Sequence, residues 1–501
     1  MMSDRNVTKY CKRFLALCIV TGLLFTTTGC SVFGPKQKPY KTYKPSVSET
    51  PVASEQPVVN LSEEQAGEFA RCYLAKMTTE QKVAQLFVVK LEELDGSQGG
   101  YYEFRKCTKG MKTTLSQIPV GGVVLFSRNI STRKKTSKLI QRLQVNSQTP
   151  LFVTVDEEGG SVARIASNKK MKTTKFPTAE SIGKTKDVEY VYNMGRTIAR
   201  EIRALGFNVN FAPVADVKTS DLNTEIGERS FGSDPGKVSD MVAAFVQGSQ
   251  ERGVCATLKH FPGQGSSDGD THQGSVDIDS SISKLRDLDF VPFKAGIDAG
   301  AEFVMVSHIS VSRVTETKEP ASMSELIMKT ILREELGFSG IVITDAFDMA
   351  SITDDYTPGE AALQSFMAGA DIILMPNDLT QAYQAILNAV NSKKITQSRL
   401  DESVIRILTT KFKHGILTQE DLTVWEQPTA TPSVTPAVTA SPKAKKGKKN
   451  RESAKTIKKS TKISRKSSCP LARFSETVIM LLVKVFHPKE DRQHEGEQND
   501  V

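Results

Sequence analysis

The 501-residue sequence contains one tryptophan and seven cysteines, and no two cysteines form a CxxC pair. This spacing excludes the common structural zinc motifs. No GxGxxG follows the first apolar run, which excludes a dinucleotide-binding fold of that kind. No apolar run is long enough to span a bilayer as a mature helix, which excludes a polytopic membrane protein. With 39% hydrophobic residues the chain is also too apolar to be wholly disordered.

The formal net charge of +9 comes from the ends of the chain. Residues 443–466 hold twelve Lys and Arg against one Glu, and residues 1–29 carry +3. Residues 30–442 therefore carry about −3, so nucleic-acid binding is not expected of the main body. The run 443–466 is predicted to be a disordered tail, and an anionic polymer or anionic lipid is its candidate partner, with nucleic acid a weaker option.

The N-terminus has the organisation of a bacterial export signal. A basic segment precedes an apolar run at 14–25, and Thr27-Thr28-Gly29-Cys30 follows. The cysteine after this site resembles a lipobox, which predicts a lipid on Cys30 and a membrane anchor, although Thr27 departs from the usual Leu or Val. An ordinary cleaved signal peptide and an uncleaved anchor are the alternatives. The predicted location is the bacterial cell envelope, on its periplasmic or extracellular face.

Composition divides the rest of the chain. We predict a signal peptide over 1–29, a tether rich in Lys, Pro and Ser over 30–60, and a catalytic barrel over 61–418. A Pro/Thr linker and the Lys-rich tail are predicted for 419–466. The segment 467–501 combines a short apolar stretch with a charged C-terminus.

Eight apolar runs of strand length alternate with helical stretches. Continuous apolar runs without alternation are typical of parallel strands that are buried on both faces. The pattern predicts an α/β fold, a single (β/α)₈ TIM-type barrel, with a doubly wound sheet as the competitor. The predicted strands are 85–90, 122–126, 151–155, 209–213, 255–260, 303–308, 341–344 and 372–375.

In such a barrel the loops after the strands carry the chemistry. Asp156, Arg164 and Arg229 follow the third and fourth strands, where a carboxylate can accept sugar hydroxyls and Arg can donate in a fork. An acidic turn paired with its own Arg164 and a surface Arg229 are the structural alternatives. Asp345 ends the seventh strand, where a buried unpaired carboxylate would be costly without a function. Asp348 is expected at the start of the next helix.

The loop after the fifth strand holds Lys259-His260-Phe-Pro-Gly-Gln-Gly and then Asp270-Thr-His272. An Asp two residues before a His can form a proton-transfer dyad, because the carboxylate orients the ring and stabilises imidazolium. A metal site on His260, Asp270 and His272 is the alternative, and a polar surface loop is the simplest interpretation.

Together these motifs resemble glycoside hydrolase family 3, in its bacterial β-N-acetylhexosaminidase branch. DEEGGSVARI, IGERSFGSDP, KHFPGQG, VMVSHI, TDAFDM and ILMP occur in the family order over roughly 65–415. The resemblance implies a retaining mechanism without metal or cofactor, Asp345 as nucleophile, and His272 as acid/base with Asp270 as its partner. It implies that the terminal N-acetylglucosamine of a glycan or muropeptide is held by a set of five residues. These are Asp156, Arg164, Arg229, Lys259 and His260.

Two positions depart from the family pattern. Gln264 stands where the family usually has a third His, and Thr271 replaces the common Ser. We expect activity to persist, because Gln still forms hydrogen bonds and Thr keeps the hydroxyl. The expected form is a monomer that cleaves peptidoglycan fragments. A phosphorylase or β-glucosidase of the same family and an inactive wall-binding lipoprotein are the alternative functions.

Overall fold

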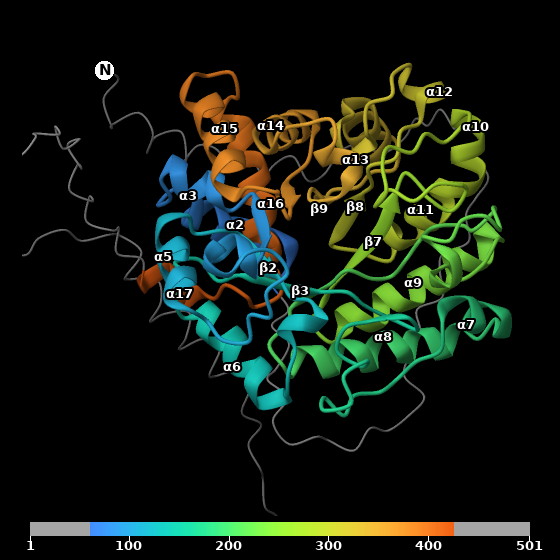
Figure 1. Ribbon diagram of the computed structural model, residues 1–501, viewed down its shortest axis with the longest axis horizontal. Helices are drawn as coiled ribbons and strands as arrows, with labels where there is room; N and C mark the ends of the chain where they lie inside the picture. The colour runs from blue at the N-terminus through green and yellow to red at the C-terminus, as the bar shows by residue number, and fades with distance from the viewer. Residues whose placement is uncertain (1–60, 425–501) are drawn as a thin grey trace, which may run out of the picture. The chain divides into compact units, whose positions relative to one another are not determined.

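The computed structural model describes residues 61–424 and contains a closed barrel of eight parallel strands (Figure 1). Going round the barrel, the order β1-β10-β9-β8-β7-β6-β3-β2 pairs each strand with its neighbours in the chain. The predicted (β/α)₈ barrel is therefore confirmed. The barrel strands are β1 (Phe87–Lys90), β2 (Gly122–Val124), β3 (Phe152–Val155), β6 (Val209–Asn210), β7 (Cys255–Phe261), β8 (Phe303–Val306), β9 (Ile341–Ala346) and β10 (Ile372–Leu374).

All eight predicted runs form strands because both faces of the sheet are covered. Side chains of β3, β7 and β8 are buried along the whole of each strand. Inside the barrel, Phe152 and Phe303 meet edge to face with ring centroids 5.3 Å apart. The closing pair is regular, with Phe87 opposite Ile373 and Val88 opposite Leu374. Such a closed sheet has no unpaired edge, and the loops after its strands form the mouth.

Helices surround the barrel (Figure 1). Thr78 begins α3 with the predicted capping box, because its side chain accepts from the Gln81 N–H and the Gln81 side chain accepts from the Thr78 N–H. The α-helices are α2 (Glu63–Leu74), α3 (Thr79–Ala84), α4 (Leu91–Leu94), α5 (Lys109–Gln117), α6 (Arg133–Gln144), α7 (Ala179–Thr185), α8 (Val188–Arg203), α9 (Pro235–Glu251), α10 (Ile282–Lys284), α11 (Phe290–Asp298), α12 (Ser312–Thr315), α13 (Ala350–Thr353), α14 (Pro358–Ala368), α15 (Leu379–Asn391), α16 (Gln397–Lys413) and α17 (Gln419–Val424).

Shorter elements complete the ring and the mouth. The 3-10 helices are η1 (Gly96–Gln98), η2 (Ser127–Asn129), η3 (Gly227–Arg229) and η5 (Ala321–Met323), and the π-helices are η4 (Leu285–Asp289) and η6 (Leu326–Glu335). A two-stranded hairpin, β4 (Glu157–Gly159) with β5 (Val162–Ala163), rises from the end of β3. This hairpin places the predicted Asp156–Arg164 motif on the mouth of the barrel.

Helical structure extends past the predicted end of the barrel at 418. Residues 419–424, predicted as the start of the linker, form α17. Thr418 explains this, because its N–H and hydroxyl both donate to Asp421 while Leu422 packs on the core. The predicted signal peptide, Cys30, the tether 30–60, the tail 443–466 and the segment 467–501 lie outside the described residues.

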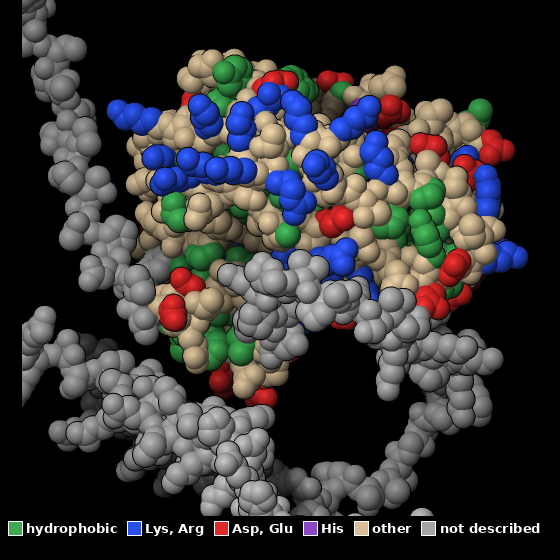
Figure 2. Space-filling model, turned by 90° about the horizontal axis from the view of Figure 1, so that it is seen from below, with side chains coloured by type: hydrophobic (Ala, Val, Ile, Leu, Met, Phe, Trp, Pro, Cys, Tyr) green, Lys and Arg blue, Asp and Glu red, His purple; other side chains and the backbone are tan. Residues whose placement is uncertain are grey.

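One face of the barrel is strongly basic (Figure 2). Helix α6 buries Leu139, Ile140 and Leu143 and has no acidic residue among its own twelve. Its exposed side includes Lys134, Lys135 and other cations, so charge is unevenly distributed over a body of slightly negative net charge. Within residues 61–424, no helix is both long and apolar enough to cross a membrane.

Candidate active site

Asp345 lies at the carboxyl end of β9, where the strand leaves the barrel. Its Oδ1 accepts a hydrogen bond of 2.8 Å from the Ala346 N–H, which fixes the carboxylate at the mouth. Two residues before α13, Asp348 accepts a hydrogen bond of 2.8 Å from Lys90 and so ties this loop to β1. The half-buried Asp345 thus has one fixed oxygen and one available for chemistry.

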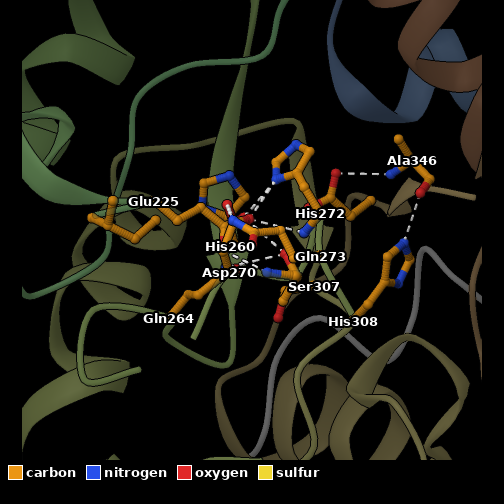
Figure 3. Close-up of polar contacts among 12 residues, drawn as sticks. Glu225, His260, Gln264, Asp270, His272, Gln273, Ser307, His308 and Ala346 are labelled. Carbon is orange, nitrogen blue, oxygen red and sulfur yellow. Dashed lines mark hydrogen bonds and ion pairs between the residues drawn. The ribbon is translucent and has the colours of Figure 1, made fainter. Parts of the chain in front are cut away.

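His308, at the end of the neighbouring strand β8, supports the same loop. Its Nε2 lies 3.0 Å from the Ala346 carbonyl (Figure 3). Its Nδ1 lies 2.8 Å from the Ser322 hydroxyl. Burial lowers the pKa of His308, which favours a neutral ring that donates from Nε2 and accepts at Nδ1. His308 therefore positions the backbone beside Asp345.

The predicted dyad is formed on the loop after β7. The Nδ1 atom of His272 lies 3.0 Å from Oδ1 of Asp270, and the same oxygen accepts the His272 N–H at 2.9 Å. Gln273 donates to the other Asp270 oxygen at 2.9 Å. Because Nδ1 faces a carboxylate, it carries the proton, and Nε2 remains the atom that can exchange a proton with a ligand.

A second carboxylate, Glu225, reaches His272 from the loop after β6. Its Oε1 lies 3.2 Å from His272 Nδ1. The hydrogen bond to Glu225 is the largest cause that raises the pKa of His272 to about 9, with further contributions from Asp270 and Asp345. Burial would raise the pKa of Glu225, but hydrogen bonds from His272 and Thr271 outweigh burial and lower that pKa to about 2. At neutral pH the site therefore holds an imidazolium between two carboxylates.

A charged cluster lies at the ends of β3 and β7. Lys259 Nζ lies 2.9 Å from Asp156 and 2.6 Å from Glu158, and the Lys259 side chain is only 3% exposed. Arg229 donates to both oxygens of Glu158, at 3.0 and 2.8 Å. Burial would raise the pKa of Glu158, but Arg229 and Lys259 outweigh it and hold that pKa far below its usual range.

His260 extends this cluster to a buried acid. Its Nδ1 lies 2.7 Å from Asp216, so it donates there, and its Nε2 accepts from Arg229 at 3.3 Å. Asp216 also accepts the N–H groups of His260 and Gln264. The chain of contacts fixes the tautomer of His260 and the orientation of Arg229.

The hairpin that carries Arg164 is held by Glu157. Glu157 is buried and accepts the N–H groups of Ile165 and Ala166 at 2.7 and 2.9 Å. Arg164 lies 3.9 Å from Asp156, and its buried Nε has no hydrogen-bond partner among the described residues. The rest of the Arg164 side chain is partly exposed, so its terminal nitrogens remain within reach of a ligand.

The structure brings together the predicted site residues in two groups. Asp345, Asp270 and His272 form the first, and Asp156, Arg164, Arg229, Lys259 and His260 form the second. Sequence reasoning gave no role to Glu158, Asp216 or Glu225. Glu225 stands four residues before Arg229 in a loop of the mouth, but only the folded path of that loop brings it to His272.

The alternative metal site on His260, Asp270 and His272 is not formed, since His260 is engaged by Asp216 and Arg229. Among residues 61–424, the group of His and acidic side chains that is spaced closely enough to hold a cation is a different one. It consists of Glu225, Asp270 and His272, whose ligand atoms all lie within 4.8 Å of one another. We interpret them as an imidazolium and its two counter-ions, because the donors and acceptors already match one another.

Comparison with known proteins identifies the family to which the chain belongs. The model of the glycosyl hydrolase family 3 N-terminal domain matches residues 78–410. Beta-hexosaminidase A of Pseudoalteromonas piscicida is 35% identical over 327 residues, which are 60% of this chain and 54% of that protein. Beta-hexosaminidase LpqI of Mycobacterium tuberculosis is 34% identical over 350 residues, covering 67% of this chain and 84% of the relative.

A solved structure gives the same result. The family 3 β-N-acetylglucosaminidase from Paenibacillus sp. str. FPU-7 superposes with a TM-score of 0.63 at 31% identity. The match covers 72% of this chain and 66% of that one. This chain thus spans about half of one curated relative and most of another, and the resemblance stated from its motifs is confirmed.

Proposed function

This chain belongs to glycosyl hydrolase family 3, and we propose that it is a retaining β-N-acetylhexosaminidase that removes terminal N-acetylglucosamine. The observation that carries the proposal is the arrangement at the mouth, where Asp345 ends β9 and the charged His272 is held by Asp270 and Glu225. A nucleophile and a proton donor from separate strands are the two groups that the reaction requires.

In the first step the carboxylate of Asp345 attacks the anomeric carbon. Protonated His272 gives its Nε2 proton to the glycosidic oxygen, the bond to the leaving group breaks, and a glycosyl ester forms on Asp345. In the second step neutral His272 takes a proton from water, which attacks the anomeric carbon and releases the sugar with Asp345 as leaving group. The configuration at the anomeric carbon is retained, because two displacements occur on opposite faces.

The charged cluster is proposed to hold the sugar. Asp156 can accept two hydroxyl hydrogen bonds, while Lys259, Arg229 and Arg164 donate to the remaining oxygens. Asp156, Lys259 and Arg229 are held by neighbours before the ligand arrives, which limits the entropy lost on binding. His260 completes the set through the hydrogen bond it receives from Arg229.

Peptidoglycan fragments are the proposed substrate, and the cell envelope is the proposed location. The support is the export signal with its lipobox-like Cys30. The basic face of α6 and the tail 443–466 would suit an anionic lipid or wall polymer near such an anchor. A monomer fits the proposal, because each barrel carries both catalytic groups. Mass spectrometry of the N-terminal peptide tests the anchor, and an unmodified Cys30 contradicts it.

An assay with an aryl N-acetylglucosaminide and the matching aryl glucoside tests the activity, each with and without phosphate. We expect the N-acetylglucosaminide to be preferred and free sugar to be the product. Asp345→Ala should lower kcat by at least about 10³-fold, and His272→Ala by about 10²- to 10⁴-fold. Asp354→Asn, an exposed acid on α13's end, is the control. Wild-type turnover in both active-site variants would contradict the proposal.

A phosphorylase is the second candidate, because His272 is a histidine rather than a carboxylate. An anionic acceptor such as phosphate would be repelled by a carboxylate base but not by imidazole. In that case phosphate would accelerate release and yield sugar 1-phosphate. Preferential turnover of the aryl glucoside would favour a β-glucosidase. Binding to wall fragments without turnover of either substrate would favour an inactive wall-binding protein.

A further inference from the structure

Glu225 accepts hydrogen bonds from three residues of the loop that carries the acid/base (Figure 3). Its Oε2 accepts the Thr271 N–H at 2.9 Å and the Gln264 side chain at 2.5 Å. Its Oε1 accepts the Thr271 hydroxyl at 2.8 Å and lies 3.2 Å from His272 Nδ1. Glu225 comes from the loop after β6. The three residues supply four donor groups, two of them from Thr271, and all four lie on the loop after β7.

We propose that Glu225 is a positioning residue that anchors the acid/base loop to the barrel and, with Asp270, aims His272 Nε2 at the glycosidic oxygen. This inference rests on the proposed function, in which His272 transfers the proton.

Asp270 alone does not locate His272 relative to the nucleophile. It lies two residues from His272 on the same loop, so it orients the ring within the loop but moves with it. The His272 side chain is 64% exposed, so packing does not fix it either. The Glu225 side chain is only 7% exposed and belongs to the loop after a different strand. It therefore fixes His272 relative to the barrel, which Asp270 alone does not do.

Other contacts join the same two loops. Asn223 donates to the Gln264 carbonyl at 2.7 Å, and Thr219 N–H donates to the Gly265 carbonyl at 3.1 Å. The side chain of Gln264 is fully buried, and its Oε1 has no hydrogen-bond partner among the described residues. Only its amide hydrogens are engaged, with Glu225 and Thr271, so Glu225 determines where this side chain lies.

Both departures from the family pattern contact Glu225. Gln264 replaces the usual His and Thr271 replaces the common Ser, and in this chain both side chains donate to Glu225. A Gln amide supplies two donors and takes no charge, so Gln264 donates to both Glu225 and Thr271. The three residues act as one set that holds the loop over the mouth.

Glu225→Gln tests the proposal in the full-length protein, with Glu228→Gln, an exposed acid of the same loop, as the matched control. The variant keeps the size but loses the charge and presents an amide to the Thr271 and Gln264 donors. We expect kcat to fall about 10- to 100-fold with KM within about 3-fold, since proton transfer rather than binding is impaired. Amide hydrogen exchange in 264–273 should become faster, and Glu225→Asp should recover part of both losses.

Two further readouts separate positioning from simple destabilisation. The charged groups that face His272 are Glu225, Asp270 and Asp345, so removing Glu225 should move the alkaline limb of kcat/KM to lower pH. An aryl leaving group of low pKa needs little protonation, so its cleavage should be far less affected than that of an alkyl glycoside. Should Glu225→Gln not fold, Thr271→Val removes one donor and is measured in its place.

The inference is wrong if Glu225→Gln matches Glu228→Gln in kcat, in pH profile and in loop exchange while His272→Ala is inactive. If His272→Ala also keeps wild-type turnover, the proposed function fails instead. The exchange experiment does not depend on turnover, so unchanged exchange in 264–273 overturns the anchoring role in either case.

Discussion

The Nδ1 atom of His272 lies 3.0 Å from Asp270 and 3.2 Å from Glu225, so one imidazole nitrogen faces two carboxylates. Both carboxylates favour the imidazolium and both require a hydrogen on Nδ1. The proton on Nε2 is then the one available for transfer. This relationship keeps the proposed acid/base in its protonated form throughout the neutral range.

The pH dependence of activity follows from the pKa of about 9 for His272. Its pKa is raised from 6.5, so the proton needed for the first step is retained below pH 9 and lost as pH rises through that value. We expect the alkaline limb of kcat/KM for an aryl N-acetylglucosaminide near pH 9.

Asp270→Asn provides the matched comparison. Loss of this charge should shift the alkaline limb to lower pH and reduce kcat about 10- to 100-fold, because imidazolium is less stabilised. Wild-type enzyme whose alkaline limb lies near the unperturbed value of histidine would contradict the electrostatic description of the site.

Lys259→Met should destabilise the protein as well as impair binding. Glu158 would lose a partner at 2.6 Å while remaining buried, and breaking a buried pair costs about 3–5 kcal/mol. Chemical unfolding of Lys259→Met and of Lys170→Met, an exposed control, measures the difference. Equal unfolding free energies would show that Glu158 and Asp156 do not depend on Lys259.

Gly265→Ala tests the contact between the two loops without touching a charged group. A Cβ at Gly265 would lie 2.0 Å from the Val217 carbonyl oxygen, so the loops would have to separate. We expect kcat to fall about 10-fold or more, because misplacing a catalytic group by about 1 Å can cost 10²-fold. Gly236→Ala, whose Cβ would meet its nearest neighbour at 3.4 Å, is the control and should leave kcat unchanged.

The barrel was predictable from the sequence because its strands are buried on both faces. Apolar residues therefore follow one another without alternation in segments such as 303–306 and 372–374, and the structure confirms these as β8 and β10. Boundaries were less predictable. Gln85 was assigned to the first strand but forms the C-cap of α3, since a residue between a helix and a strand satisfies either pattern locally.

The site was predictable where one loop holds all the participants. Asp270 and His272 are two residues apart, so their pairing follows from local geometry. Glu225 lies 46 residues from its partner Thr271, and Glu158 lies 71 residues from Arg229. Such contacts depend on how separate loops cross the mouth, which residue types and spacing do not determine.

The central claim is that Asp345 forms a covalent bond to the sugar with His272 as proton donor. Incubation with a 5-fluoro N-acetylglucosaminyl fluoride, which slows both steps while its leaving group needs no strong acid, followed by peptide mass spectrometry, tests it directly. We predict an added glycosyl mass on the peptide containing Asp345, in the wild type and in His272→Ala, and none in Asp345→Ala. An adduct on another residue, or turnover of the reagent without any adduct and with inversion at the anomeric carbon, would contradict this account.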